Sequence, residues 1–138
     1  QAIENDDFFS TVRVTREEEA IGVISGSWLV HTRGALLCQS SGLANAINPL
    51  TSLTEVAGIP FLGLVVRRGD LGEFNPAQVP FGYSMPRVLD VLGIRNHHLN
   101  DAEKVRKTVD MAAKSAFSTE EPYILTLETT LTGAKNEH

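Results

Sequence analysis

The stretch "IPFLGLVVRR", residues 59–68, decides the fold class of this chain. From Ile59 to Val66 it contains only apolar side chains, glycine and proline, and it ends on two arginines. A strand that is apolar on both faces is typical of a parallel sheet covered by helices on both sides. The stretch therefore predicts a central strand of an α/β fold, in which a parallel sheet is flanked by helices.

On either side of this stretch, shorter apolar runs typical of strands alternate with segments that have helical spacing of apolar residues. Strands are expected at residues 11–15, 34–40, 59–68 and 123–128, and helices at 17–30, 41–58, 84–93 and 101–117. Pro49 should bend or interrupt the second helix, Gly58 should end it, and Asp101 should cap the last one. With no repeat or linker, residues 1–138 are interpreted as a single domain.

Composition narrows the class of function. The chain has 138 residues, 42% of them hydrophobic, and a net charge of -5, which gives no basic footprint for nucleic acid. Its apolar runs are too short to span a bilayer, so no membrane partner is expected. The acidic start "QAIENDDFFS" lacks the basic region of a signal peptide, and the single Cys38 excludes an internal disulfide. A cytoplasmic location is the default expectation.

Ligands of open parallel sheets bind at the carboxyl ends of the strands. That rule selects residues 15–19, 39–45, 67–78 and the segment after Glu128. In the first of these, three glutamates begin a helix, where acidic side chains complement the helix dipole. Glu17 also shares the apolar stripe of Ala20 and Ile21, whereas Glu18 and Glu19 point to the sides. Glu17 is therefore the carboxylate placed to exchange a proton in a reaction.

The other two loops carry weaker indications. "QSSGLANAIN", residues 39–48, places small residues at a helix start, which suits either anion binding or an ordinary tight turn. Arg67 and Arg68 end the central strand, and they suit an anionic substrate or a surface basic pair. His97 and His98 are interpreted as structural or surface residues, because neighbours on a strand point to opposite faces and the pair is expected on a peripheral element with no carboxylate or cysteine nearby. No metal site is predicted.

Taken together, these stretches resemble the pyrimidine-binding (PYR) domain of thiamine-diphosphate enzymes. Within that family they are similar to the sulfopyruvate decarboxylase alpha subunits and the phosphonopyruvate decarboxylases. The resemblance is carried by "VTREEEAIGVISGSWL", "ALLCQSSGLANAINPL", "IPFLGLVVRRGDLGEFNPAQVPFG" and "RVLDVLGI", and it covers roughly residues 12 to 128. The family pattern His-Glu-x-x-Ala, with Gly nine positions after the Glu, is matched by Glu17, Ala20 and Gly26, with Arg16 in place of His.

The resemblance implies decarboxylation of a 2-keto acid, sulfopyruvate or phosphonopyruvate, with thiamine diphosphate as cofactor. The family's glutamate, here Glu17, hydrogen-bonds N1′ of the aminopyrimidine and so helps the cofactor to lose its C2 proton. By the same matching, the cofactor-binding residues are Glu17, Ser40, Ser41, Gly42 and Asn45. The substrate-binding residues are Arg67, Arg68 and Gln78.

The resemblance also implies a partner. The chain has no Gly-Asp-Gly…Asn signature, so Mg²⁺ and the diphosphate are expected on a beta subunit with a PP domain, packed against small residues at Gly22, Ser25 and Gly26. The family's first helix and first strand have no counterpart, which indicates an N-terminally truncated domain. Two alternatives stay open: another thiamine-diphosphate enzyme, such as an acetolactate-synthase-like or simple 2-keto acid decarboxylase subunit, and a non-catalytic PYR-like binding module.

Overall fold

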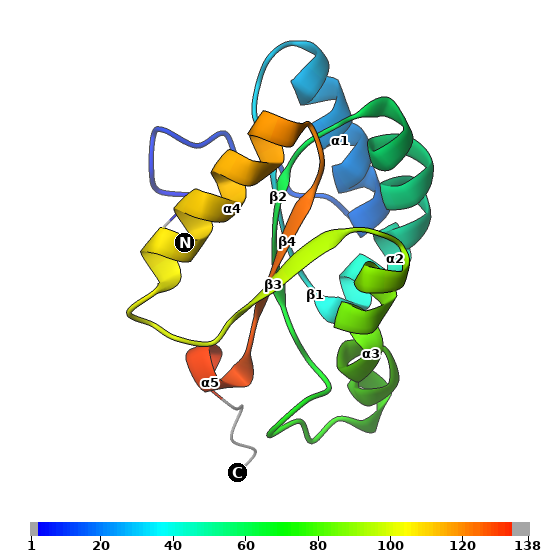
Figure 1. Cartoon of the computed structure of the whole chain (residues 1–138), viewed down its shortest axis with the longest axis vertical. Coiled ribbons are helices and arrows are strands. Elements are labelled where there is room, and N and C mark those ends of the chain that lie inside the picture. Colours follow the sequence, from blue (N-terminus) through cyan, green and yellow to red (C-terminus); the bar gives the residue numbers. More distant parts are fainter. Residues whose placement is uncertain (1–2, 134–138) are drawn as a thin grey trace.

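A four-stranded parallel sheet forms the centre of the molecule in the computed structural model, which describes residues 3–133 (Figure 1). Its strands are β1 (Ala35–Gln39), β2 (Leu62–Val66), β3 (Arg95–Leu99) and β4 (Tyr123–Leu127). They lie in the order β1-β2-β4-β3, and every neighbouring pair is parallel. This confirms the predicted α/β class, with the stretch quoted above next to the edge strand β1.

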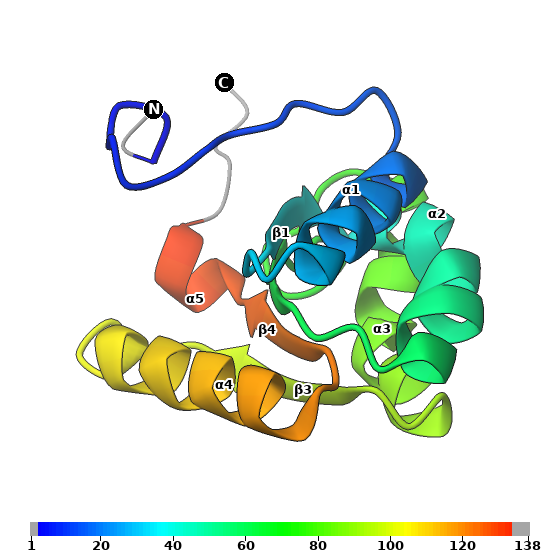
Figure 2. The ribbon, with the colours of Figure 1, turned by 90° about the horizontal axis from the view of Figure 1, so that it is seen from above.

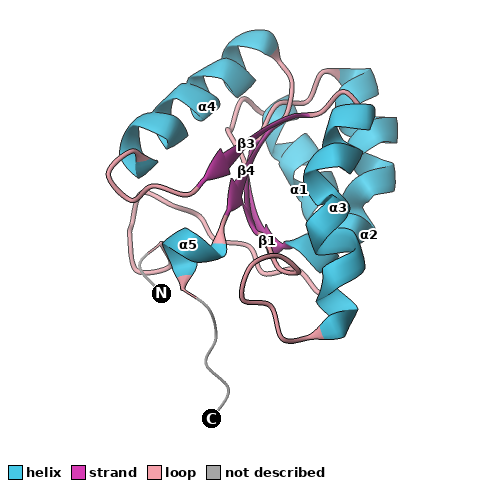
Figure 3. Ribbon diagram, turned by 60° about the horizontal axis from the view of Figure 1, so that its bottom comes forward, coloured by secondary structure: helices cyan, strands magenta, loops and turns pink. Residues whose placement is uncertain are grey.

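Helices cover both faces of the sheet. Figures 2 and 3 show α4 (Val105–Thr119) on one face and α1 (Glu17–Leu29), α2 (Ser40–Pro49) and α3 (Val79–Val91) on the other. A π-helical segment, η1 (Leu50–Glu55), continues α2, and a 3-10 turn, η2 (Pro76–Gln78), precedes α3. The four-residue α5 (Thr129–Thr132) follows β4. The carboxyl ends of all strands therefore share the edge at the bottom of Figure 1, beside α5 and the β2–α3 loop.

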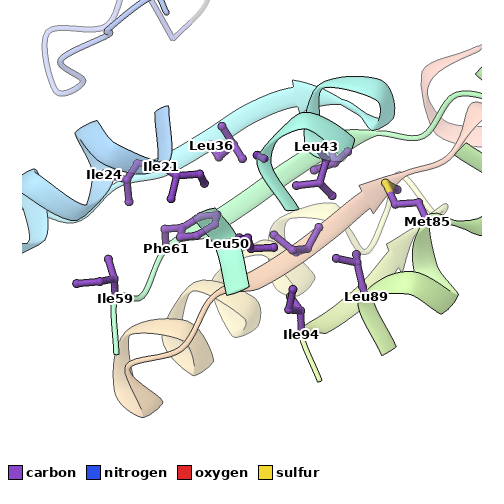
Figure 4. Close-up of a cluster of buried hydrophobic side chains, with 13 residues drawn as sticks. Ile21, Ile24, Leu36, Leu43, Leu50, Ile59, Phe61, Met85, Leu89 and Ile94 are labelled. Atoms are coloured by element: carbon purple, nitrogen blue, oxygen red, sulfur yellow. The ribbon is translucent and has the colours of Figure 1, made fainter. Parts of the chain in front are cut away.

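The main core lies between the sheet and the three helices on one face (Figure 4). Its fully buried side chains include Ile21 of α1, Leu43 of α2, Val65 of β2, Met85 of α3 and Ile124 of β4. A smaller cluster of Leu62, Ala112 and Leu125 seats α4 on the opposite face. Because burial of each large apolar side chain contributes roughly 1.5–3 kcal/mol, these two clusters fix both helical layers on the sheet.

The expected strand at residues 11–15 is wrong. Residues 9–14 form no regular secondary structure and pair with no strand, and Val12 is 61% exposed. Alternating β-branched residues favour an extended backbone, but a strand also needs a neighbour that accepts and donates its ladder hydrogen bonds. In Figures 1 and 2 this segment runs outside the sheet before it enters α1.

Helix boundaries differ from the predicted ones for local reasons. Pro49 ends α2 because it lacks an N–H, and the chain continues as the wider η1, while Gly58 takes the predicted left-handed conformation with φ 62°. Helix α3 begins earlier than predicted, since Pro80 is tolerated in a first turn.

The predicted cap of the last helix is wrong. Asp101 does not cap α4, because the helix begins at Val105. The Asp101 carboxylate instead accepts from the N–H of Glu103 at 3.0 Å.

No helix within residues 3–133 combines the length and apolar character needed to cross a membrane.

Candidate active site

The first turn of α1 separates its three glutamates by contact. Glu19 Oε2 accepts the N–H of Thr15 at 3.0 Å, which closes the start of the helix much as a capping box does. Glu18 pairs with Arg16, whose Nε lies 2.6 Å from Oε1. Its own backbone N–H and then Arg16 lower the pKa of Glu18. Both side chains therefore serve the helix terminus, as the sequence predicted.

Glu17 instead faces α2. Its carboxylate occupies the space that a β-carbon on Gly42 would fill, and its Oε2 accepts from Nδ2 of Asn45 at 3.4 Å. Cys38, at the end of β1, is close enough for the charge of Glu17 to act on its thiol. Burial, and then Glu17, raise the pKa of Cys38 to about 12. The inward direction that the helical spacing predicts for Glu17 is thus confirmed, while its catalytic role stays a prediction.

The β1–α2 junction connects this carboxylate to the next strand. Ser40 is fully buried, and its Oγ accepts the N–H of Arg68 at 3.2 Å. Ser41 is half-buried in the same first helical turn, and Gly42 is buried against Glu17. The four residues predicted to bind cofactor, Ser40, Ser41, Gly42 and Asn45, therefore lie together beside Glu17. The structure brings them together, and their binding role stays a prediction.

The β2–α3 loop is held by a second carboxylate. Glu73, 3% exposed, accepts from Arg68 Nε at 2.7 Å, from Arg68 Nη2 at 2.8 Å and from the N–H groups of Gly69 and Asn75. Hydrogen bonding from Arg68 is the largest cause that lowers the pKa of Glu73 to about 2. Arg68 is thus engaged in a bidentate pair inside its own loop.

Arg67 is engaged more completely. Its Nη1 lies 2.7 Å from Oδ2 of Asp70 and 3.2 Å from Oε2 of Glu128. Its Nε and Nη2 donate to the carbonyls of Gly82 and Tyr83 at 3.1 and 3.2 Å. The side chain is only 11% exposed, so its charge is compensated within the chain. The predicted substrate-binding role of both arginines therefore needs an exchange of partners.

Glu128 connects three strands. It follows β4, contacts Arg67 at the end of β2, and places Oε1 2.7 Å from Nδ1 of His98 on β3. Thr126 Oγ1 lies 3.0 Å from the same ring nitrogen. The expectation that no carboxylate lies near the histidine pair is wrong for His98, because parallel pairing of β3 with β4 sets residues 30 positions apart side by side.

Gln78, the third predicted substrate residue, precedes α3. Its carbonyl packs on Gly69, which has a φ of 83°, and its side-chain Oε1 is buried without a hydrogen-bond partner in the described part of the chain. An unpaired buried acceptor is costly, so Gln78 is ready to accept a hydrogen bond from a bound group.

Two adjacent pockets open at this edge of the sheet. One, of about 180 Å³, is lined by Arg67, Arg68, Glu73 and Thr129 among others. The second, of about 260 Å³, has a lining that includes Arg67, Asp70, His98, Asn100, Glu128 and Thr130. Arg67 is shared by both. Within residues 3–133, no three His, Cys, Asp or Glu side chains come together as a possible metal site.

Two of the three small residues expected to meet a partner lie on the surface, and their role in binding it stays a prediction. Gly22 and Gly26 are exposed, and a β-carbon at either would touch nothing within 4 Å. Ser25 does not belong to that surface: it is buried, and its Oγ donates to the carbonyl of Ile21 at 2.7 Å. Residues three or four apart share a helix face, and Ser25 falls on the inner face with Ile21.

Sequence reasoning missed Asp70, Glu73, His98 and Glu128 as members of this region. The strand-end rule does select the segment that carries Asp70 and Glu73, and its last segment begins directly after Glu128. The rule does not predict which ion pairs form, because the sequence around a single acidic residue in a loop does not show which cationic side chain it will contact.

No family model matches the chain. It is 36% identical over 123 residues to the sulfopyruvate decarboxylase subunit alpha of Methanocaldococcus jannaschii, which covers 89% of this chain and 73% of that one. It is 35% identical over 126 residues to the same subunit of Methanococcus maripaludis, covering 91% and 75%. A phosphonopyruvate decarboxylase of Streptomyces hygroscopicus is 46% identical over 65 residues, which are 47% of this chain and 16% of that protein. With this share of both chains aligned to two alpha subunits, the chain belongs to the sulfopyruvate decarboxylase alpha-subunit family.

Proposed function

We propose that the chain is the PYR-type alpha subunit of a thiamine-diphosphate-dependent decarboxylase that acts on sulfopyruvate or phosphonopyruvate. The reaction releases CO₂ and leaves sulfoacetaldehyde or phosphonoacetaldehyde. The observation that carries this proposal is Glu17, a half-buried carboxylate on Gly42, beside the first turn of α2 and at the carboxyl edge of the sheet. The names of the aligned relatives support the reaction class.

The residues around Glu17 fit the aminopyrimidine of that cofactor. Gly42 leaves room for the carboxylate, and Asn45 holds Oε2, so that Oε1 is the oxygen left to hold a proton at a ring nitrogen. Ser40, Ser41 and Gly42 would line the same place. When bound, thiamine diphosphate supplies the nucleophile and the electron sink for decarboxylation. This chain's part is to orient the ring and to keep a carboxylate at its nitrogen.

The substrate side is formed by the β2–α3 loop. Arg67 and Arg68 supply planar donors suited to carboxylate, sulfonate or phosphonate. The unpaired Oε1 of Gln78 would accept from a hydroxyl, which the substrate gains only when its carbonyl oxygen is protonated. The Glu73 and Ser40 contacts hold the loop in one conformation before substrate arrives. A preformed loop spares the reaction part of the entropy cost of ordering.

The second subunit is proposed from the name "subunit alpha" of the relatives. We propose a beta subunit with a PP domain, which would hold Mg²⁺ and the diphosphate. The exposed face of α1 at Gly22 and Gly26 would allow it to approach closely.

The test is reconstitution with a PP-domain partner. The purified pair is assayed with sulfopyruvate, phosphonopyruvate and pyruvate, with released CO₂ as the readout. Glu17→Gln should lower kcat by about 10³-fold or more, whereas Glu18→Gln and Glu19→Gln should keep most of it. Full activity in Glu17→Gln would refute the assignment. A preference for pyruvate would indicate a simple 2-keto acid decarboxylase, and thiamine-dependent binding without turnover would indicate a non-catalytic module.

A further inference from the structure

Arg67 has no vacant place for an anion on Nη1. Nη1 donates to the two oxygens of Glu128 at 3.2 and 3.3 Å and lies 2.7 Å from Oδ2 of Asp70, while Nε and Nη2 donate to backbone carbonyls. A sulfonate or phosphonate that binds Nη1 of Arg67 must therefore displace one of the two carboxylates.

Distances show which carboxylate is ready to leave. Asp70 lies closer to Nη1 of Arg67, at 2.7 Å, than Glu128 does, at 3.2 Å. Glu128 is nearer to His98, at 2.7 Å, than to Arg67, at 3.2 Å. Glu128 is 12% exposed, and a buried carboxylate without a cation is costly, so it needs His98 as its partner once Arg67 is taken.

We propose that His98 and Glu128 form a charge-exchange pair that controls access of the substrate's second anionic group to Arg67. The ligand is a sulfonate or phosphonate, and this inference rests on the proposed decarboxylase function. When the anion enters the pocket, Arg67 moves from Glu128 to the ligand, and Glu128 pairs with His98 alone. No bond is made or broken, and the positive partner of each anion is retained.

The exchange is complete only when His98 carries a proton. A neutral ring gives Glu128 one hydrogen bond, whereas an imidazolium also gives it a countercharge. Histidines change charge between about pH 5 and pH 8, so anion binding and proton uptake are linked. The charged groups that face His98 are Glu128 directly and, across the pocket, Arg67 and Asp70. Thr126 is its neutral neighbour.

The decisive experiment is the pH dependence of KM for sulfopyruvate in the reconstituted complex, between about pH 6 and about pH 8.5. Sulfopyruvate is the right substrate because its sulfonate keeps one fixed charge over this range. In the unmodified complex, KM should rise by up to about tenfold per pH unit after His98 loses its proton, because one proton is linked to one bound anion. The KM rise should occur with little change in kcat.

Two variants separate exchange from a structural role. Glu128→Gln removes the competing charge but keeps the side-chain shape, so KM should be low and independent of pH. His98→Gln removes the countercharge, so KM should be high and independent of pH. His97→Gln, on the other side of the same strand, is the matched control and should behave as the unmodified complex. A flat KM profile in the unmodified complex, or a raised KM in Glu128→Gln, would overturn the proposal.

A binding experiment separates this inference from the proposed reaction. The ring signals of His98 in the full chain are followed by NMR against pH, with and without methanesulfonate, and are assigned with His98→Gln. Methanesulfonate should move the titration of His98 to higher pH, even if the complex shows no decarboxylation. An unmoved titration would refute the exchange, whereas absent turnover with a moved titration would refute only the decarboxylase function.

Discussion

The carboxylate of Glu17 lies where a side chain on Gly42 would have to be, so the two positions depend on each other. Gly42 is in the first turn of α2, where its φ is not left-handed and any residue could adopt the backbone. The lack of a side chain at Gly42 is therefore needed to leave space for the Glu17 carboxylate, and not for the backbone conformation of the helix. The pair gives a way to move the proposed catalytic group without mutating it.

Gly42→Ala should impair activity far more than stability. The new methyl group meets the end of the flexible Glu17 side chain, which can give way, and alanine favours a helix over glycine by about 1 kcal/mol. Displacement of a catalytic group by about 1 Å can cost about 10²-fold in rate. We expect a large loss of kcat with a nearly unchanged midpoint of urea unfolding. Equal losses of both would show that the glycine is needed for packing.

Glu73→Gln should remove an acid-sensitive part of the chain's stability. The pKa of Glu73 is about 2 in the folded chain, below its ordinary value of 4.5. A lowered carboxyl pKa stabilises the fold above about pH 4.5, and this contribution is lost as pH falls toward 2. At about 1.4 kcal/mol per pKa unit, it amounts to about 3 kcal/mol.

Urea unfolding at about pH 6 and at about pH 3 measures this contribution. The free energy of unfolding should fall more steeply with acid in the unmodified chain than in Glu73→Gln. Asp110→Asn, which alters an exposed pair with Lys114, serves as the control and should keep the full pH dependence. If Glu73→Gln kept it too, Glu73 would not be the group responsible.

Cys38 should react slowly with thiol reagents in the folded chain. Burial, and then Glu17, raise its pKa to about 12, against about 8.5 for a free cysteine. At about pH 8 the thiolate fraction falls on the order of 10³-fold, and the rate of disulfide exchange with an aromatic disulfide reagent should fall with it. The same reaction in urea gives the unfolded reference.

Glu17→Gln should raise that rate, because it removes the charge that opposes the thiolate of Cys38. This readout reports the position of Glu17 without cofactor, partner or substrate. Glu19→Gln is the matched control, since Glu19 is occupied with the N–H of Thr15. Equal rates for all three proteins would place Glu17 away from Cys38.

Gly26→Ala should have opposite effects on the chain and on its complex. In the chain alone a β-carbon at Gly26 meets nothing, and the change should stabilise α1 by about 1 kcal/mol. If α1 is the face that meets the partner, the added methyl group should weaken association. Thermal unfolding and analytical ultracentrifugation measure the two effects. Unchanged association would place the partner elsewhere.

The sequence predicts those features that depend on local pattern. Apolar runs and their spacing predict the parallel sheet, the helix that begins at Glu17 and the inward direction of that residue. Pattern fails where structure depends on distant partners. Residues 11–15 have the composition of a strand but no neighbouring strand to pair with. Nothing in the sequence shows a partner for Arg67, whereas in the structure it forms ion pairs with Asp70 and Glu128.

The position of β4 has a consequence for the order in which the chain can fold. The last strand in sequence lies between β2 and β3, so β3 has no partner in the sheet until β4 is inserted. Arg67 likewise cannot pair with Glu128 until that residue, 61 positions further along the chain, has been synthesised. At a synthesis rate of about 5–20 residues per second, that interval lasts about 3–12 s on the ribosome. This edge of the sheet is therefore assembled last, and an intact Arg67–Glu128 contact marks a chain that has finished folding.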